Sequence, residues 1–562
     1  MPGGGELTLV AYGSQNKAIS GNPEMTFFYK VFKRHTHFSQ ESISITMDGP
    51  NEMMLDSPIS IRAKIPRSAD LISDLTFVFN IPDLYSMSYP DSTGPLPIRH
   101  GRRPAVRWIH MLGPLIMNSV GIFVGGSKVQ EFTGEWIALR AQMDLPADKY
   151  LKWRTMVGDV PELHTPESGI YAYNSAGNYP FKAGLYPHVF VGSSKTPAPS
   201  IPTTEIRVPL PFWFSEAIGK ALPLVALQLH EVEVQIKLKS LREIYRVMDN
   251  ATFLDRTSVN GNVQTEPLRY GRNLLIDPAI PTSFTLSATG VYDNLTLQNN
   301  YIYSQPNTTD PLNVFYSPTS LISQEGFNMN AHLEGNYIYL TEKEQLMFAE
   351  RELTYLVHQV QIFNTPQITT KTKLDLDVHG LVHRMVFFGR RDDAIDYRND
   401  YLNLSNWKNL GKSPYWPMSP ADVTPNSGQL LPSGYANRDI LQSARLICAG
   451  NDLFEEKPAK FYEVQVPYMT TTGSGIAGLH PGSLRPDDVM GPVYQIPFAV
   501  NGSDHEQPSG TLNTSRLREF QLEVTPWPLA ADAPYTFDFT VYVESLNMVK
   551  FTNGMGGMSY AV

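Results

Sequence analysis

EVEVQIKLK, residues 231–239, places Val232, Val234, Ile236 and Leu238 on one side of an extended chain and charged or amide side chains on the other. This period of two is typical of a β-strand that is buried on one face and polar on the other. A helix of the same length would need apolar residues three and four positions apart. The stretch therefore predicts a strand at the surface of a β-sheet core.

The same alternation recurs at both ends of the chain. Apolar residues take every second position in 43–47, in 59–65 and in 537–543. Residues 75–81 form a continuous run of mainly apolar residues, which indicates a strand buried on both faces. The strand signal therefore spans the whole sequence.

Helical signals are few and short. Thr341 and Glu344 have capping-box spacing ahead of an apolar run, residues 132–143 favour a second helix, and Ser215 is a candidate N-cap of a third that reaches about Leu222 before Pro223. A parallel α/β sheet would need a long helix between most strands. The pattern predicts an all-β protein of sandwiches with long loops and a few short helices.

Composition narrows the class of protein. The 562 residues carry a net charge of −10, so the surplus of Lys and Arg that a DNA-coating protein needs is missing. The single cysteine excludes an intrachain disulfide. The N-terminus lacks the features of a signal peptide. The apolar runs along the chain are too short to span a bilayer. We expect a soluble chain that folds in a reducing compartment and makes no direct contact with nucleic acid.

The chain divides into blocks by pattern rather than by repeats. We expect an N-terminal arm at 1–25, a first sandwich at 26–240, a linker at 241–250 and a second sandwich at 251–562. The arm begins with a Gly-rich stretch, which loses much entropy on ordering. Residues 144–203 and 397–434 show little periodicity and are predicted to be long surface loops.

Several short phrases mark turns and core aromatics in a fixed order along the chain. They are Ser20–Pro23 before Thr26–Phe28, Pro211–Phe214, Ala221–Gln228, Asn336–Leu340, Gln507–Arg516 and Gly554–Gly557. In this order they resemble the major capsid proteins of the nucleocytoplasmic large DNA viruses. The resemblance extends over nearly the whole chain, and it places Asn336–Leu340 in the second of two domains.

The resemblance implies a structural protein without enzymatic activity or cofactor, built from two tandem jelly rolls. It implies a homotrimer that forms a pseudo-hexagonal capsomer and tiles an icosahedral virion shell assembled in the host cytoplasm. The implied partners are neighbouring capsomers, minor capsid and penton proteins, and an internal membrane on the inner face.

Two other functions remain as alternatives. His35, His37 and Glu41 form half of a cupin metal motif, which would fit a bicupin metalloenzyme, because histidines two apart on a strand point the same way. Polar residues at the end of a strand explain the same pattern. The second alternative is a β-sandwich lectin that binds glycans with its long loops.

The remaining polar motifs favour structural interpretations. His379 and His383 have helical metal-site spacing, but Gly380 and the strand-like residues that follow argue against a helix. Residues 390–393, Arg-Arg-Asp-Asp, are predicted to be a solvated charge cluster. Candidate glycosylation sequons, which the host secretory pathway is not expected to reach, are Asn250, Asn294, Asn307, Asn403, Asn501 and Asn513.

Overall fold

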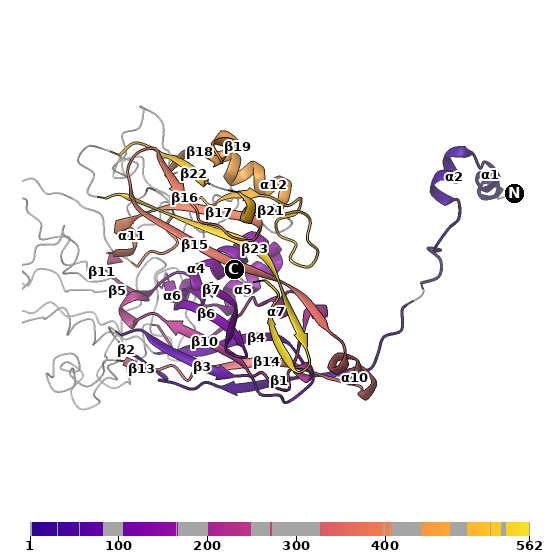
Figure 1. Cartoon of the computed structure of the whole chain (residues 1–562), viewed down its shortest axis with the longest axis horizontal. Coiled ribbons are helices and arrows are strands. Elements are labelled where there is room, and N and C mark those ends of the chain that lie inside the picture. Colours follow the sequence, from indigo (N-terminus) through magenta and orange to yellow (C-terminus); the bar gives the residue numbers. More distant parts are fainter. Residues whose placement is uncertain are drawn as a thin grey trace, which may run out of the picture.

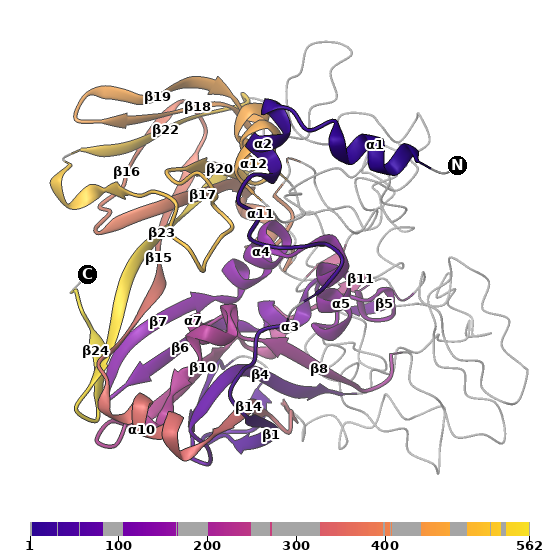
Figure 2. The same cartoon turned by 90° about the vertical axis from the view of Figure 1, so that its right-hand side faces the viewer.

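The strands of this computed structural model form two β-sandwiches in tandem, joined by a helix-containing layer (Figures 1 and 2). The structure describes residues 3–30, 32–54, 57–82, 105–164, 166, 201–248, 270–271, 326–396, 399–404, 406, 440–471, 492–517, 519–529 and 535–560. All pairs of strands within the described part are antiparallel, as expected for jelly rolls rather than for a parallel α/β sheet.

The first sandwich packs two main sheets face to face. One sheet contains β1 (Phe38–Thr46), β14 (His332–Leu340), β4 (Leu71–Ile81), β8 (Thr204–Pro209) and, on β4, β9 (Leu222–Pro223). The other contains β3 (Ile59–Lys64), β10 (Val232–Leu238), β6 (Met117–Val124) and β7 (Ser127–Thr133). Smaller pairings join β12 (Tyr270–Gly271), β11 (Tyr245–Met248) and β5 (Ala105–Trp108), and β13 (Gly326–Asn328) with β2 (Glu52–Met54).

The second sandwich has the same two-layer arrangement. Its inner sheet contains β15 (Leu353–Ile368), β23 (Phe537–Thr552), β17 (Leu381–Arg391) and β20 (Tyr494–Pro497), with β21 (Leu512–Asn513) on β17 and β24 (Met555–Met558) on β23. Its outer sheet contains β16 (Thr372–Asp375), β22 (Phe520–Pro526), β18 (Leu441–Cys448) and β19 (Asn451–Pro458). The chain is therefore all-β, with two tandem jelly rolls.

Helices are short and lie outside the sheets. The α-helices are α1 (Gly4–Val10), α2 (Ser14–Ser20), α3 (Leu112–Leu115), α4 (Gly134–Asp144), α5 (Ala147–Met156), α6 (Pro161–His164), α7 (Trp213–Glu216), α10 (Glu342–Glu350), α11 (Asp392–Asp396) and α12 (Val466–Thr470). Single turns of other helix types are η2 (Ile218–Lys220), η3 (Leu224–Ala226), η4 (Leu241–Glu243), η6 (Phe461–Gln465) and η7 (Thr514–Arg516).

Two of the three predicted helices form much as expected. α4 begins after Thr133, whose side chain accepts a hydrogen bond from the Trp136 amide at 3.2 Å. α10 follows Thr341 as predicted, although no side-chain cap bond forms there. The helix expected after Ser215 is wrong: α7 already begins at Trp213, and η2 is a separate turn. Phe212, Trp213 and Phe214 are fully buried, so aromatic packing positions this segment.

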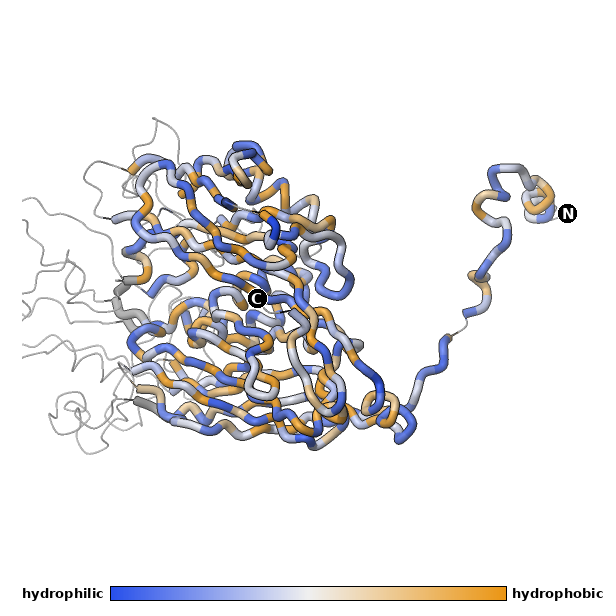
Figure 3. Tube along the Cα trace, viewed as in Figure 1, coloured by the Kyte–Doolittle hydropathy of each residue, from blue (hydrophilic) through white to orange (hydrophobic). Residues whose placement is uncertain are grey.

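The alternation in 231–239 has the predicted outcome. Val232, Val234, Ile236 and Leu238 are buried in the first core, and the polar side chains between them are less buried. The hydropathy colouring of Figure 3 shows such alternation along the strands of both sandwiches. Period-two patterning therefore determines which face of each strand packs inward.

The predicted domain boundaries differ from the sheet topology. Strand β14 was assigned to the second sandwich, at 251–562, but it pairs with β1 and β4 in the first. β14 supplies the strand between β1 and β4, which are not paired with each other. The first sandwich therefore includes residues beyond the expected linker at 241–250.

The N-terminal arm is longer than predicted. Every described residue from 3 to 42 is exposed, and β1 begins only at Phe38 rather than near Thr26. Figure 1 shows α1, α2 and the extended segment after them reaching away from both sandwiches. Within the described residues, no helix is long and apolar enough to cross a membrane.

The predicted loops contain more structure than expected. The 144–203 segment includes α5 and α6, and Trp153 of α5 is buried in the first core. Residues 167–200 and 407–439, which make up most of the two predicted loops, lie outside the described residues. The apolar and polar residues of α5 are nearly equal in number and only Trp153 is buried, so its periodicity is too weak to predict a helix.

Candidate functional site: the junction between the jelly rolls

The inner sheet of the second sandwich is buried on both faces. On one face Met385, Phe387 and Val541 pack into the second core. On the opposite face Val386 and Tyr542 join the first core, and Tyr542 lies 5.1 Å from Trp136 of α4, measured between ring centroids. The two jelly rolls therefore share a continuous interface, in which α4 lies between them (Figure 2).

A hairpin extends this junction toward the chain's C-terminal end. Gly554 forms the turn between β23 and β24 with φ of 78°, a conformation that favours glycine. Its carbonyl accepts a hydrogen bond from the Leu229 amide at 2.9 Å, so the hairpin of the second sandwich is bonded through its backbone to a loop of the first. The Gly-rich phrase at 554–557 thus has the architectural role expected of it.

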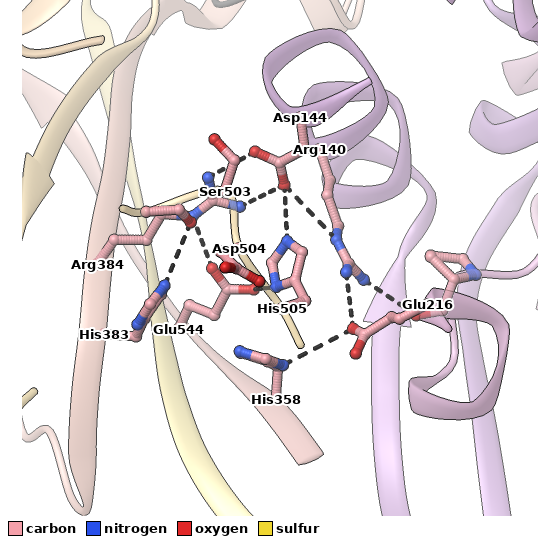
Figure 4. Close-up of polar contacts among 12 residues, drawn as sticks. Arg140, Asp144, Glu216, His358, His383, Arg384, Ser503, Asp504, His505 and Glu544 are labelled. Carbon is pink, nitrogen blue, oxygen red and sulfur yellow. Dashed lines mark hydrogen bonds and ion pairs between the residues drawn. The ribbon is translucent and has the colours of Figure 1, made fainter. Parts of the chain in front are cut away.

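Arg384 is the centre of a buried ionic network at this junction (Figure 4). Its two terminal nitrogens each donate to one carboxylate oxygen of Asp144 at 2.7 Å, and its Nε donates to Glu544 at 2.6 Å. Arg384 comes from β17, Glu544 from β23 and Asp144 from the end of α4. One guanidinium therefore binds a carboxylate of each jelly roll in bidentate or charge-assisted geometry.

These contacts determine the charge state of the network. Burial acts to raise the pKa of Asp144 and of Glu544, but the neighbouring guanidinium of Arg384 outweighs it and holds both pKa values below their usual range. Burial acts in the other direction on Arg384, whose pKa is nevertheless raised by the two carboxylates. The three groups are therefore ionised together.

A second set of ion pairs extends the network within the first jelly roll. Arg140 donates to Glu216 at 2.8 Å, and Lys220 donates to the other Glu216 oxygen at 2.9 Å. Lys220 also donates to the backbone carbonyl of His505, which belongs to the second jelly roll. The carboxylates Asp144, Glu216 and Glu544 are thus matched by Arg140, Arg384 and Lys220.

Three buried histidines fill the space between these charges. His505 donates from Nε2 to Asp144 at 3.0 Å, and His383 Nε2 lies 3.3 Å from the Gly502 carbonyl. His358 lies 4.6 Å from His505 between ring centroids. Within the described part of the chain, the Nδ1 atoms of all three rings have no hydrogen-bond partner.

The network favours the neutral forms of His358 and His383. Burial lowers the pKa of His358 well below its usual value, and the nearby His505 and Arg140 lower it further. Burial also lowers the pKa of His383, against the opposing effect of Glu544. A cavity of about 740 Å³, lined in part by Arg140, Asp144 and His505, opens beside the network and gives solvent a route to it.

The chemistry of this site is that of a structural joint. Each carboxylate is held by a cation at hydrogen-bonding distance, so none is left to act as a free base or nucleophile. Two groups of residues in the described part have donor atoms close enough for a metal ion: Glu216, His358 and His505 at the junction, and His110, Asp159 and His164 in the first jelly roll.

The residues proposed from sequence lie elsewhere. His35 and His37 are exposed in the segment before β1, and Glu41 in β1 accepts a hydrogen bond from Tyr339 at 3.0 Å. Neither metal-compatible group contains them. Of the sequons, Asn513 is exposed, Asn403 and Asn501 are half-buried, and Asn250, Asn294 and Asn307 lie outside the described residues.

One sequence interpretation is wrong. Arg390 and Arg391 were expected to be solvated, but both are buried. Arg390 donates to the Tyr401 carbonyl at 2.8 Å, and the Arg391 guanidinium lies 3.3 Å from the Tyr535 ring centroid. The strand predicted around His383 is confirmed as β17.

Comparisons with known proteins agree with this architecture. The sequence model described as "Major capsid protein N-terminus" matches residues 26–303, and that described as "Large eukaryotic DNA virus major capsid protein" matches residues 344–557. The double jelly-roll fold and these matches define a viral capsid protein.

Similar proteins cover the full length. "Probable capsid protein 4" of Acanthamoeba polyphaga mimivirus is 23% identical over 99% of both chains. The major capsid protein of Phaeocystis pouchetii virus is 22% identical, also over 99% of both. The crystal structure of PBCV-1 VP54 superimposes with a TM-score of 0.57 and 18% identity, covering 96% of this chain and 100% of that one. The chain belongs to the major capsid proteins of large eukaryotic DNA viruses, and it is a structural protein rather than an enzyme.

Proposed function

We propose that three copies of the chain assemble around a threefold axis into a capsomer with a pseudo-hexagonal outline, and that these capsomers tile an icosahedral shell. The observation that carries this proposal is the buried junction between the two jelly rolls. Because shared core and ionic contacts hold the two sandwiches together, one chain supplies two similar blocks in a fixed arrangement. Three such chains place six blocks around one axis, which closed cyclic symmetry favours.

Exposed apolar side chains on the body support an assembling surface. Tyr468 of α12 is 88% exposed, and Met469 beside it, Val500 and Ile218 are also exposed. Tyr468 and Met469 are neighbours in α12, and large exposed apolar side chains side by side are typical of surfaces that other chains cover. We assign these residues to contacts between copies of the chain, within or between capsomers.

The purified protein is expected to be a stable trimer. An obligate interface of well over about 2,000 Å² would keep it assembled at micromolar concentration. Light scattering coupled to size exclusion should give the mass of three chains, and negative-stain images should show a hexagonal outline. A monodisperse monomer at this concentration would contradict the proposal.

The N-terminal arm is proposed to bind the layer inside the shell. Its apolar side chains are exposed, from Ile19 at 92% in α2 to Phe28 at 99% in the segment that follows, so no part of the described body covers them. Lys17, Lys30 and Arg34 add positive charge to the same segment. A segment of this chemistry fits an acidic, partly apolar surface, such as a minor capsid protein or an internal membrane.

Deletion of residues 1–20 is therefore expected to leave the trimer folded and to weaken its incorporation into shells. The described residues of this segment, 3–20, are exposed and belong to neither core. Circular dichroism and light scattering would test folding and trimerisation, and co-expression with the other shell proteins would test incorporation. A truncated chain that fails to trimerise would assign the arm to the capsomer itself.

The proposed partners and site of assembly follow from the net charge of the chain and from its family. The net charge of −10 argues against direct binding to the genome. Neighbouring capsomers, minor capsid proteins and penton proteins are the proposed partners, and the host cytoplasm is the proposed site of assembly. The described residues offer no specific observation in favour of the bicupin or lectin alternatives.

A further inference from the structure

We propose that His110, Asp159 and His164 form a zinc site that fastens the helical segment of the first jelly roll. His110 follows β5, Asp159 lies between α5 and α6, and His164 ends α6. The three residues come from two segments, one after β5 and one around α6, which a backbone bond from the Gly113 amide to the Val157 carbonyl also joins. They lie outside the ionic network at the junction between the jelly rolls.

The distances between donor atoms fit a tetrahedral ion. His164 Nε2 lies 3.4 Å and His110 Nδ1 lies 3.7 Å from the same oxygen, Asp159 Oδ1. Zinc bonds to nitrogen and oxygen of about 2.0–2.1 Å place neighbouring ligands of a tetrahedron about 3.3–3.4 Å apart. The three donor atoms all lie within 4.8 Å of one another, so small rotations of the rings bring them onto one ion.

The surroundings hold the ligands in position. Arg154 Nε donates to the other oxygen, Asp159 Oδ2, at 2.5 Å, which orients Oδ1 toward the two rings. The Met111 amide also approaches Oδ1, at 3.4 Å. The two imidazole rings lie 4.0 Å apart between centroids. Asp159 and His164 are buried, whereas the His110 side chain is 24% exposed and leaves a path for the ion.

The other metal-compatible group is less suited to an ion. Both carboxylate oxygens of Glu216 already accept hydrogen bonds from cations, namely Arg140 and Lys220. An ion there would have to displace one of them. Asp159 instead has a cation on one oxygen and directs the other toward two histidines.

The test is zinc binding by the purified full-length protein after dialysis against a chelator. With zinc chloride alone as the probe, we expect one ion per chain by elemental analysis and calorimetry. The variant His110→Gln should bind zinc at least about tenfold more weakly. Removing a group that only orients a ligand already lowers metal affinity by about this factor, and removing a ligand lowers it more. Zinc should raise the melting temperature of the wild-type chain but not that of the variant.

Two control variants make the result specific. His379→Gln removes an exposed histidine whose Nε2 lies 3.4 Å from Asp377, the same spacing as His164 and Asp159 but without a second histidine. His358→Gln removes a ligand of the other group. Both variants should bind zinc like the wild-type chain, and equal binding by His110→Gln or loss of binding in His358→Gln would overturn the proposal. Should His110→Gln fail to fold, cobalt(II) added to the wild-type chain decides, because the absence of a four-coordinate absorption band would also overturn it.

Discussion

Replacing Arg384 by methionine is expected to destabilise the chain by about 3–5 kcal/mol, because it leaves buried carboxylates without their cation. Asp144 and Glu544 both bind this guanidinium; Glu544 is buried at the junction, and the Asp144 side chain is 9% exposed. His505 and Arg140 remain near Asp144, but the Arg140 Nε lies 3.7 Å away. Urea unfolding at fixed protein concentration, followed by tryptophan fluorescence, would measure the loss.

Arg445→Met is the matched control for this experiment. Arg445 also binds a carboxylate through two nitrogens, at 2.7 and 3.0 Å from Glu523, but its side chain is 30% exposed. Lys371 would continue to pair with Glu523 at 2.8 Å. We expect a loss of about 1 kcal/mol or less. Equal losses of stability in the two variants would show that the network at the junction contributes no more than a partly exposed ion pair.

A triple variant separates the cost of unpaired charge from the cost of lost packing. Asp144→Asn, Glu544→Gln and Arg384→Met together remove all three charges from the centre of the network. Since a buried carboxylate without a partner causes most of the expected loss, the triple variant should be more stable than Arg384→Met alone. A triple variant that is less stable would assign the effect to packing and hydrogen bonds.

The sequence predicted the strands well because a half-buried strand needs only local alternation. Val232, Val234, Ile236 and Leu238 could be assigned to a core face without knowledge of their partners. The position of β14 could not be predicted in this way, because pairing with β1 and β4 depends on segments far apart in the chain. Alternation determines which residues face inward but not which sheet a strand joins.

The junction was missed for a related reason. Glu544 lies on the polar face of β23. The sequence pattern of such a face does not show whether its side chains contact water or another domain. Arg384 lies in the middle of a strongly apolar strand, which was the available signal, since a charge in a buried strand needs a partner. Its partner Asp144 comes from the other jelly roll, and no local pattern links the two.

Acidification from pH 6.5 to 5 is expected to destabilise the chain through its buried histidines, among them His358 and His383 at the junction. Burial lowers both pKa values in the folded state, whereas the unfolded chain has ordinary histidines near 6.5. Below pH 6.5 the unfolded state therefore binds more protons than the folded state, and stability falls as the pH falls. Each histidine contributes a slope of about 1.4 kcal/mol per pH unit until its folded pKa is reached.

Protonation of the carboxylates lowers stability only at lower pH, so its effect can be separated from that of the histidines. The pKa values of Asp144 and Glu544 are lowered from 3.8 and 4.5, so their contribution is intact above this range and is lost only as the pH falls further. Urea midpoints measured between pH 7 and 5 should thus report the histidines. His358→Gln should reduce the slope by about 1.4 kcal/mol per pH unit, while His379→Gln, at an exposed position, should leave it unchanged. A wild-type chain with the same stability at pH 7 and 5 would mean that the buried histidines accept these protons without cost, and it would contradict the neutral state of His358 and His383.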